Sequence, residues 1–121
     1  MVKYVKKPAI IPSVGNMPKL IEEFFGYVNT QSGDLSIARI TSPAGWIEPA
    51  QTPEFDEYTL VLKGVVHVRT ETDSYDVSAG EAFMTHRGKW VQYSTPEPEG
   101  AEYIAVCLPA FSPETVHREA E

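Results

Sequence analysis

Residues 45–64 read GWIEPAQTPEFDEYTLVLKG, and a glycine stands at each end of this stretch. The second half, from residue 57 to residue 64, is rich in β-branched and aromatic residues, which is typical of a β-strand. The first half contains two prolines within 48–53 and predicts a loop. Side chains alternate along a strand, so Glu57 and Thr59 are expected on one face. The stretch therefore predicts a carboxyl group on a strand face beside a loop.

Glycine and proline recur along the rest of the chain, and short apolar runs lie between them. This spacing favours a β-sandwich or β-barrel, because turn residues at regular intervals separate short strands. We expect strands at 35–42, 57–64, 65–71, 73–78, 81–86, 90–95 and 102–108.

Two segments outside these strands have helix-like ends. Residues 17–26 have Pro18 near a helix start and a glycine at the end, and residues 111–121 have Ser112 as a possible N-cap. We therefore predict an all-β fold, a small antiparallel β-barrel or jelly roll, with a short N-terminal helix and a C-terminal helical segment. One domain is expected over 1–121, with the barrel at about 35–108.

Composition limits the classes of function. The 121 residues have a formal net charge of −7, which repels the phosphate backbone and anionic lipids, so no nucleic acid and no membrane is expected as a partner. The single cysteine, Cys107, excludes an intramolecular disulfide. The first eight residues lack the apolar stretch of a signal peptide, and no apolar run reaches the length of a membrane span, so we expect a cytoplasmic protein.

The spacing within 45–64 resembles the first motif of the cupin superfamily, in which a glycine is followed by two histidines, a glutamate and a second glycine. Counting from Gly45, the two histidine positions hold Gln51 and Pro53, the glutamate is Glu57, and the closing glycine is Gly64. The spacing of the motif is kept and its histidines are replaced.

The second cupin motif is similar to residues 80–91, GEAFMTHRGKWV. His86 stands in place of a turn proline, and Val91 stands in place of the third histidine. The endings DEYTLVLKG and EYIAVCLPAF resemble the small cupins of the ethanolamine-utilisation type. This resemblance implies a homodimer and a barrel lined by carboxylates and aromatic side chains. With the histidines replaced it implies no metal site and no cofactor, since one carboxylate does not hold a transition metal.

Glu57 is the candidate catalytic residue. A carboxyl group inside a barrel has its pKa raised by desolvation and by neighbouring acids, and such a group suits acid–base chemistry near neutral pH. A structural hydrogen bond from Glu57 to a neighbouring strand is the alternative.

Four other residues are candidate ligand-binding groups. Gln51 lies in the loop at the expected barrel mouth, and Tyr93 shares a strand face with Val91. Arg39 would pair with Glu57 if it faced inward, although the pattern of its strand leaves its direction open. His86 is expected on a turn at the barrel rim, where it could move protons or act as a solvated turn residue.

Three functions follow as alternatives. The first is a metal-independent cupin that binds a small polar metabolite, with acid–base catalysis by Glu57. The second is a divalent-metal enzyme with unusual ligands such as Glu57 and His86. The third is a non-catalytic ligand sensor or assembly protein. Whether the protein is an enzyme is left open, because cupins support many unrelated activities.

Overall fold

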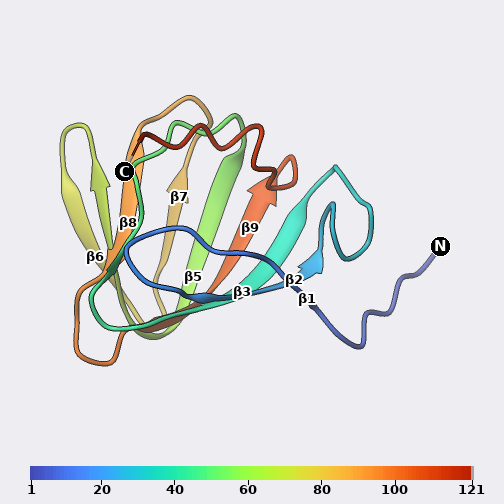
Figure 1. Cartoon of the computed structure of the whole chain (residues 1–121), viewed down its shortest axis with the longest axis horizontal. Helices are drawn as coiled ribbons and strands as arrows, with labels where there is room; N and C mark the ends of the chain where they lie inside the picture. Colours follow the sequence, from blue (N-terminus) through green and yellow to red (C-terminus); the bar gives the residue numbers. More distant parts are fainter. Residues whose placement is uncertain (121) are drawn as a thin grey trace.

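The computed structural model describes residues 1–120, and every regular element in this range is a β-strand. The strands curl around a concave interior, and the C-terminal segment crosses one end of it (Figure 1). The expectation of an all-β antiparallel fold is therefore confirmed. The strands are β1 (Ala9–Ile10), β2 (Leu20–Phe25), β3 (Ser36–Ser42), β4 (Trp46–Ile47), β5 (Asp56–Thr70), β6 (Ser74–Ser78), β7 (Ala82–Thr85), β8 (Val91–Thr95) and β9 (Ala101–Leu108).

Strand β5 belongs to both halves of the structure. Its first part pairs with β9 and β7, and its second part pairs with β8 and β6. The strands expected at 57–64 and 65–71 are thus one long strand, which continues through Gly64 at a φ of 73°. A side chain is strained at such a φ, and a Cβ on Gly64 would lie 2.1 Å from the carbonyl oxygen of Gly100. Gly64 therefore lets β5 turn from one sheet into the other.

Antiparallel pairing connects the strands in the order β1-β2-β3-β9-β5-β8-β4, with β6 and β7 also on β5. The concave side is filled by apolar side chains of both sheets, among them Trp46, Val66, Val68, Val91 and Tyr103. Alternate residues of β8 and β9 are buried, which is the period expected of strands with one face on the core. Part of this core, including Tyr93, Tyr103 and Ala105, also lines an internal cavity.

The prediction of an N-terminal helix and a C-terminal helical segment is wrong. Residues 20–25 of the predicted N-terminal helix form β2, which pairs with β1 and β3 and extends the sheet. Pairing with two neighbouring strands satisfies the backbone groups of this segment, so tertiary context outweighs its helix-like ends. Residues 111–120 form turns and an isolated bridge between Arg118 and Gln51. Residue 121 of the predicted C-terminal helix lies outside the described residues.

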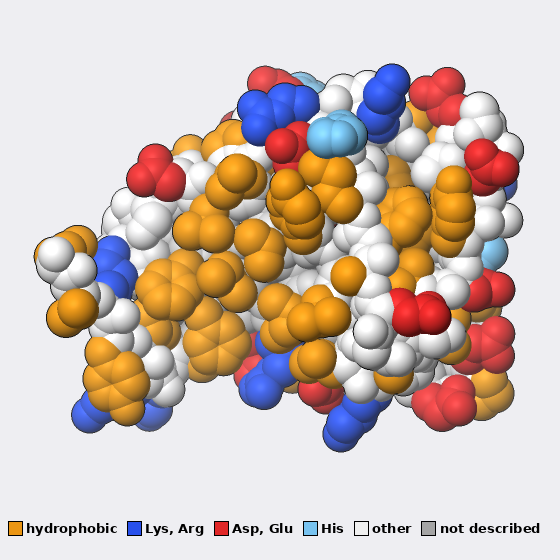
Figure 2. All heavy atoms as spheres, turned by 180° about the vertical axis from the view of Figure 1, so that it is seen from behind, with side chains coloured by type: hydrophobic (Ala, Val, Ile, Leu, Met, Phe, Trp, Pro, Cys, Tyr) orange, Lys and Arg blue, Asp and Glu red, His pale blue; other side chains and the backbone are white. Residues whose placement is uncertain are grey.

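A membrane-spanning helix is absent from residues 1–120. The outward side of β5 is apolar instead of charged, since Tyr58, Leu60 and Leu62 are each more than 40% exposed. A shallow groove beside them is lined further by Met84 of β7 and Val106 of β9, with other side chains of the same strands. Figure 2 shows hydrophobic side chains gathered over the face that is turned away from the viewer in Figure 1.

Candidate functional site

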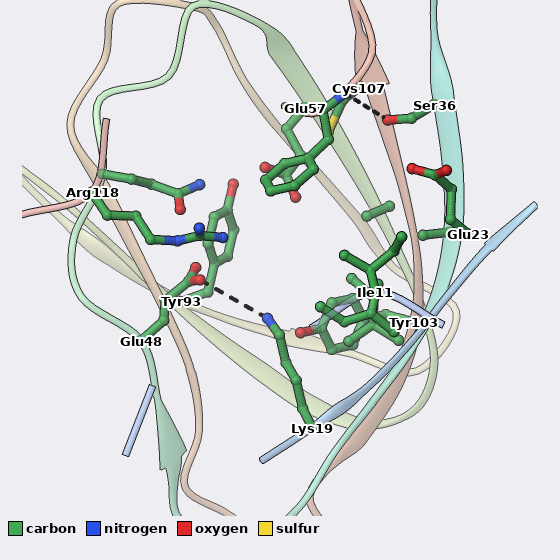
Figure 3. A pocket seen from close by; sticks show the side chains of 16 residues that line it. Ile11, Lys19, Glu23, Ser36, Glu48, Glu57, Tyr93, Tyr103, Cys107 and Arg118 are labelled. Atoms are coloured by element: carbon green, nitrogen blue, oxygen red, sulfur yellow. Dashed lines mark hydrogen bonds and ion pairs between the residues drawn. The ribbon is translucent and has the colours of Figure 1, made fainter. Parts of the chain in front are cut away.

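The interior space between the sheets is a cavity of about 70 Å³. Figure 3 shows Glu48, Tyr93 and Arg118 on one side of this cavity, facing Ile11, Glu23 and Tyr103 on the other. The charged groups are Lys19, Glu48, Glu57 and Arg118, with Glu23 at the far wall. Ionisable side chains in an enclosed space are costly unless they are paired or hydrogen-bonded, so their arrangement indicates a functional site.

Glu57 reaches the cavity from β5. Its neighbour Thr59 is buried on the same side, whereas Tyr58 and Leu60 are exposed on the other, as strand alternation predicts. Desolvation and the nearby Glu48 carboxylate raise the pKa of Glu57 to about 7, and the positive charges of Lys19 and Arg118 oppose this rise. Glu57 can therefore exchange a proton near neutral pH.

Glu48 and Lys19 form a buried ion pair at the side of the cavity. The Lys19 Nζ lies 3.9 Å from Glu48 Oε2 and 3.8 Å from the centre of the Trp46 ring. Burial lowers the pKa of Lys19 and raises the pKa of Glu48, although each charge partly offsets the change in the other. The ring face of Trp46 adds a cation–π contact to the ammonium group. Lys19 is thereby held pointing into the interior.

Gln51 and Arg118 come from two segments that cross the mouth of the cavity. Gln51 exchanges two backbone hydrogen bonds of 2.9 Å with Val91 of β8. The C-terminal segment then pairs with 50–54, because the amide N–H of Thr52 donates to the carbonyl of His117 and that of Glu54 donates to the carbonyl of Thr115. This pairing places the Arg118 side chain over the cavity, beside the ring of Phe111.

Two tyrosines, Tyr93 and Tyr103, line the cavity with their hydroxyl groups hydrogen-bonded. The Tyr93 hydroxyl is hydrogen-bonded to Thr85 at 3.1 Å, and the Tyr103 hydroxyl is hydrogen-bonded to Ser42 at 3.1 Å. Desolvation raises the pKa of both phenols, so both stay protonated. They act as neutral polar groups and not as bases.

The structure brings together three of the five residues selected from the sequence. Glu57, Gln51 and Tyr93 all line the cavity. Gln51 is almost completely buried, because the C-terminal segment covers the loop at the cavity mouth.

Arg39 and His86 lie away from the cavity. Arg39 is on the outward side of β3, where its Nε donates to Glu22 Oε1 at 3.0 Å. It therefore does not pair with Glu57. The His86 side chain is 74% exposed on the turn after β7, and its Nδ1 lies 3.9 Å from Asp56 Oδ1. A turn at the rim directs this imidazole to solvent.

Sequence reasoning missed Lys19, Glu48 and Arg118. Lys19 and Arg118 fall in segments expected to be helices, so their direction could not be inferred. Glu48 had a usable signal, because it follows the buried Trp46 by two residues and strand alternation puts both on the same side.

The donor set suits acid–base chemistry and the binding of an anion. Within residues 1–120 there is no group of three or more His, Cys, Asp or Glu side chains that could hold a metal ion. Each histidine instead has a separate carboxylate neighbour: Asp76 for His67, Asp56 for His86 and Glu54 for His117.

Comparison with curated proteins finds a relative in Myxococcus xanthus, the endoribonuclease YbeY. It is 45% identical to this chain over 101 residues, which are 84% of the chain and 34% of the relative. The chain thus spans about a third of the length of the curated relative that it matches. No family model matches the chain.

Solved structures show the fold. An oxalate decarboxylase from Bacillus subtilis is similar with a TM-score of 0.78 at 17% identity, over 98% of this chain and 33% of the other. The ethanolamine utilization protein Q from Salmonella typhimurium is similar with a TM-score of 0.66 at 15% identity, over 90% of this chain and 100% of the other. The chain has a cupin-type fold, as the two glycine-framed motifs predicted.

The interpretation of the chain as a cupin that binds a small polar metabolite is contradicted. The relative at 45% identity is named an endoribonuclease, and this identity far exceeds that of the two similar structures. The correction has a physical reason, because the glycines at fixed distances determine the fold of the barrel but not its biochemical function.

Proposed function

We propose that the chain is a cupin-fold unit of an endoribonuclease system, and that it supports RNA cleavage carried out by another domain or by a partner. The observation behind this proposal is the match of 101 residues at 45% identity to a protein named endoribonuclease, of which they make up 34%. The chain is, in this view, a small cupin without the usual metal-binding histidines, similar to the ethanolamine-utilisation type.

The geometry favours a supporting role over a cleavage site inside the barrel. A cavity of about 70 Å³ holds roughly five water molecules, and a nucleotide is several times larger. Segment 111–120 also lies across the mouth, held by backbone hydrogen bonds to 50–54. An RNA strand therefore has no path to Glu57 unless this segment moves.

The surface charge also favours a supporting role for this chain over direct RNA binding. The net charge of −7 repels RNA unless basic side chains are gathered in one place. Arg39 and Arg87 are both bonded to carboxylates on the surface. We infer that RNA is contacted mainly by the other domain or partner.

A cytoplasmic location and a homodimer are further parts of this proposal. Cys107 is free and buried, which is compatible with a reducing compartment. The apolar outer face of β5 supplies a surface on which a second copy could pack.

The first experiment measures RNA cleavage in vitro. The purified chain, its Glu57→Gln variant and the Myxococcus xanthus relative are incubated with the same panel of labelled RNAs. We expect cleavage by the relative and none by the chain or its variant. Cleavage by the chain that is lost in Glu57→Gln would contradict the supporting role and would make Glu57 a catalytic residue.

The second experiment tests the link to RNA in cells. Deletion of the gene should shift the positions of RNA 5′ ends, and a plasmid copy should restore them. Unchanged RNA ends after deletion would contradict any role in RNA processing.

A further inference from the structure

Two buried polar atoms in the cavity have no hydrogen-bond partner among the described residues. One is Arg118 Nε, a donor, and the other is Gln51 Oε1, an acceptor. A buried polar group without a partner costs about 1–3 kcal/mol, so such atoms are rare and call for a ligand or water. Both atoms belong to segments that meet at the cavity mouth.

The cations beside these atoms also lack close acceptors. The Lys19 Nζ is 3.9 Å from Glu48 Oε2, which is beyond hydrogen-bond distance, and no group in residues 1–120 accepts a hydrogen bond from Arg118 Nε. Figure 3 shows Lys19 and Arg118 both extending into the interior. Two cationic groups therefore face one small space and can accept an anion there.

The two unpartnered atoms restrict which kind of anion fits the cavity. Arg118 Nε needs an acceptor, whereas Gln51 Oε1 needs a donor. A carboxylate at neutral pH offers acceptors only. A phosphate group that carries one proton offers both, because its ionised oxygens accept from arginine and its hydroxyl donates to the amide oxygen.

Size agrees with this choice. The cavity volume of about 70 Å³ corresponds to roughly five water-sized spaces, and a phosphate group has five heavy atoms. The three carboxyls at the site do not prevent binding. Glu23, at the far wall, accepts hydrogen bonds from the backbone amides of Val28 and Asn29. Glu48 is paired with Lys19, and Glu57, whose pKa is about 7, is protonated in about half of the molecules at neutral pH and can then donate a hydrogen bond.

We propose that the barrel cavity binds a single phosphate group, with Arg118 donating to it, Lys19 adding positive charge and Gln51 accepting from its hydroxyl. The phosphate is either free or at the end of an RNA fragment. The site rests on this geometry alone, and only the RNA end as its source rests on the function proposed above. For an RNA end to enter, segment 111–120 must lift from 50–54.

The test uses the full chain and inorganic phosphate as the probe. Calorimetric titration and thermal unfolding should show saturable binding and an increase in melting temperature. Sulfate has the same shape and no proton to donate, so we expect it to bind about tenfold more weakly, which is about 1.4 kcal/mol. In Gln51→Met this preference for phosphate should disappear.

Variants of the arginine complete the test. Arg118→Met should weaken phosphate binding at least tenfold, and Arg118→Lys should weaken it less, because the charge is kept and the Nε donor is lost. Arg39→Met is the matched control, since Arg39 is bonded to Glu22 outside the cavity and its loss should leave binding unchanged. Circular dichroism of each variant in the absence of phosphate shows whether it is folded.

Two results would overturn the site: no binding of phosphate by the wild type, or equal binding by folded Arg118→Met and wild type. Short RNAs with a 5′-phosphate, a 3′-phosphate or only hydroxyl ends separate the sources. Binding that requires a terminal phosphate supports the RNA end. Binding of free phosphate without any RNA end keeps the site and removes its link to RNA.

Discussion

Replacement of Glu57 by glutamine should change how the stability of the protein depends on pH. The pKa of Glu57 rises from 4.5 in the unfolded chain to about 7 in the folded protein, because burial and Glu48 disfavour the charged form. A rise of about 2.5 units, at about 1.4 kcal/mol a unit, corresponds to roughly 3 kcal/mol. This stability is fully present below pH 4.5 and is lost as the pH rises through 7.

The glutamine side chain does not ionise, so the variant keeps its stability where the wild type loses it. Urea unfolding at about pH 4.5 and about pH 8 gives the free energy of unfolding of both proteins at each pH. We expect the difference, variant minus wild type, to increase by about 3 kcal/mol between the two pH values. Taking the difference removes the contributions of titratable groups that are distant from Glu57.

Glu99→Gln is the control, because this carboxyl is exposed on the loop before β9 and its neutralisation should change stability little at either pH. If the difference between Glu57→Gln and wild type is the same at both pH values, then Glu57 is not desolvated in the cavity and the reasoning about its proton is refuted.

Three further predictions concern the backbone, metal content and association. Gly64→Ala should lower the free energy of unfolding by several kcal/mol in urea titrations, since the new Cβ would lie 2.1 Å from the Gly100 carbonyl oxygen. Gly80→Ala, whose Cβ would have nothing within 4 Å, should cost only about 1–2 kcal/mol, which comes from its positive φ. Equal costs would refute the steric argument. Elemental analysis should find less than one transition-metal ion per chain, because Gln51 and Val91 stand where histidines would be needed, and one tightly held ion per chain would contradict this. Sedimentation should show a dimer for the wild type and a 13.5 kDa particle for Leu60→Lys, which puts a charge on the apolar outer face. A monomeric wild type would show that this face is not a dimer interface.

The sequence predicted the elements whose signals are local. Glycines at fixed distances and period-two alternation located β3, β5 and β9 within a residue or two, and the same alternation placed Glu57, Thr59 and Tyr93 on the inner side. Gly64 was expected to end a strand, yet β5 continues through it, because a positive φ can turn a strand without breaking its pairing.

The parts that could not be predicted depend on contacts between distant segments. Residues 20–25 become a strand only because β1 and β3 lie on either side of them. Arg118 reaches the cavity only because its segment pairs with Gln51, which is far away in sequence. A single sequence carries no local sign of such pairings, and the charged half of the cavity therefore remained hidden.

Segment 111–120 crosses the mouth of the cavity and supplies one of its charged side chains, whereas the strands of the two sheets form the barrel itself. The sheets bury their own core, whereas Arg118 arrives on a strand-like strap that packs Phe111 and Val116 against Phe55 and Cys107. Substitutions in this strap outside its two apolar positions can therefore alter which molecules the barrel accepts without disturbing the sheet. Among proteins that share this scaffold, ligand selectivity can therefore diverge through changes in this segment while the sheets stay the same.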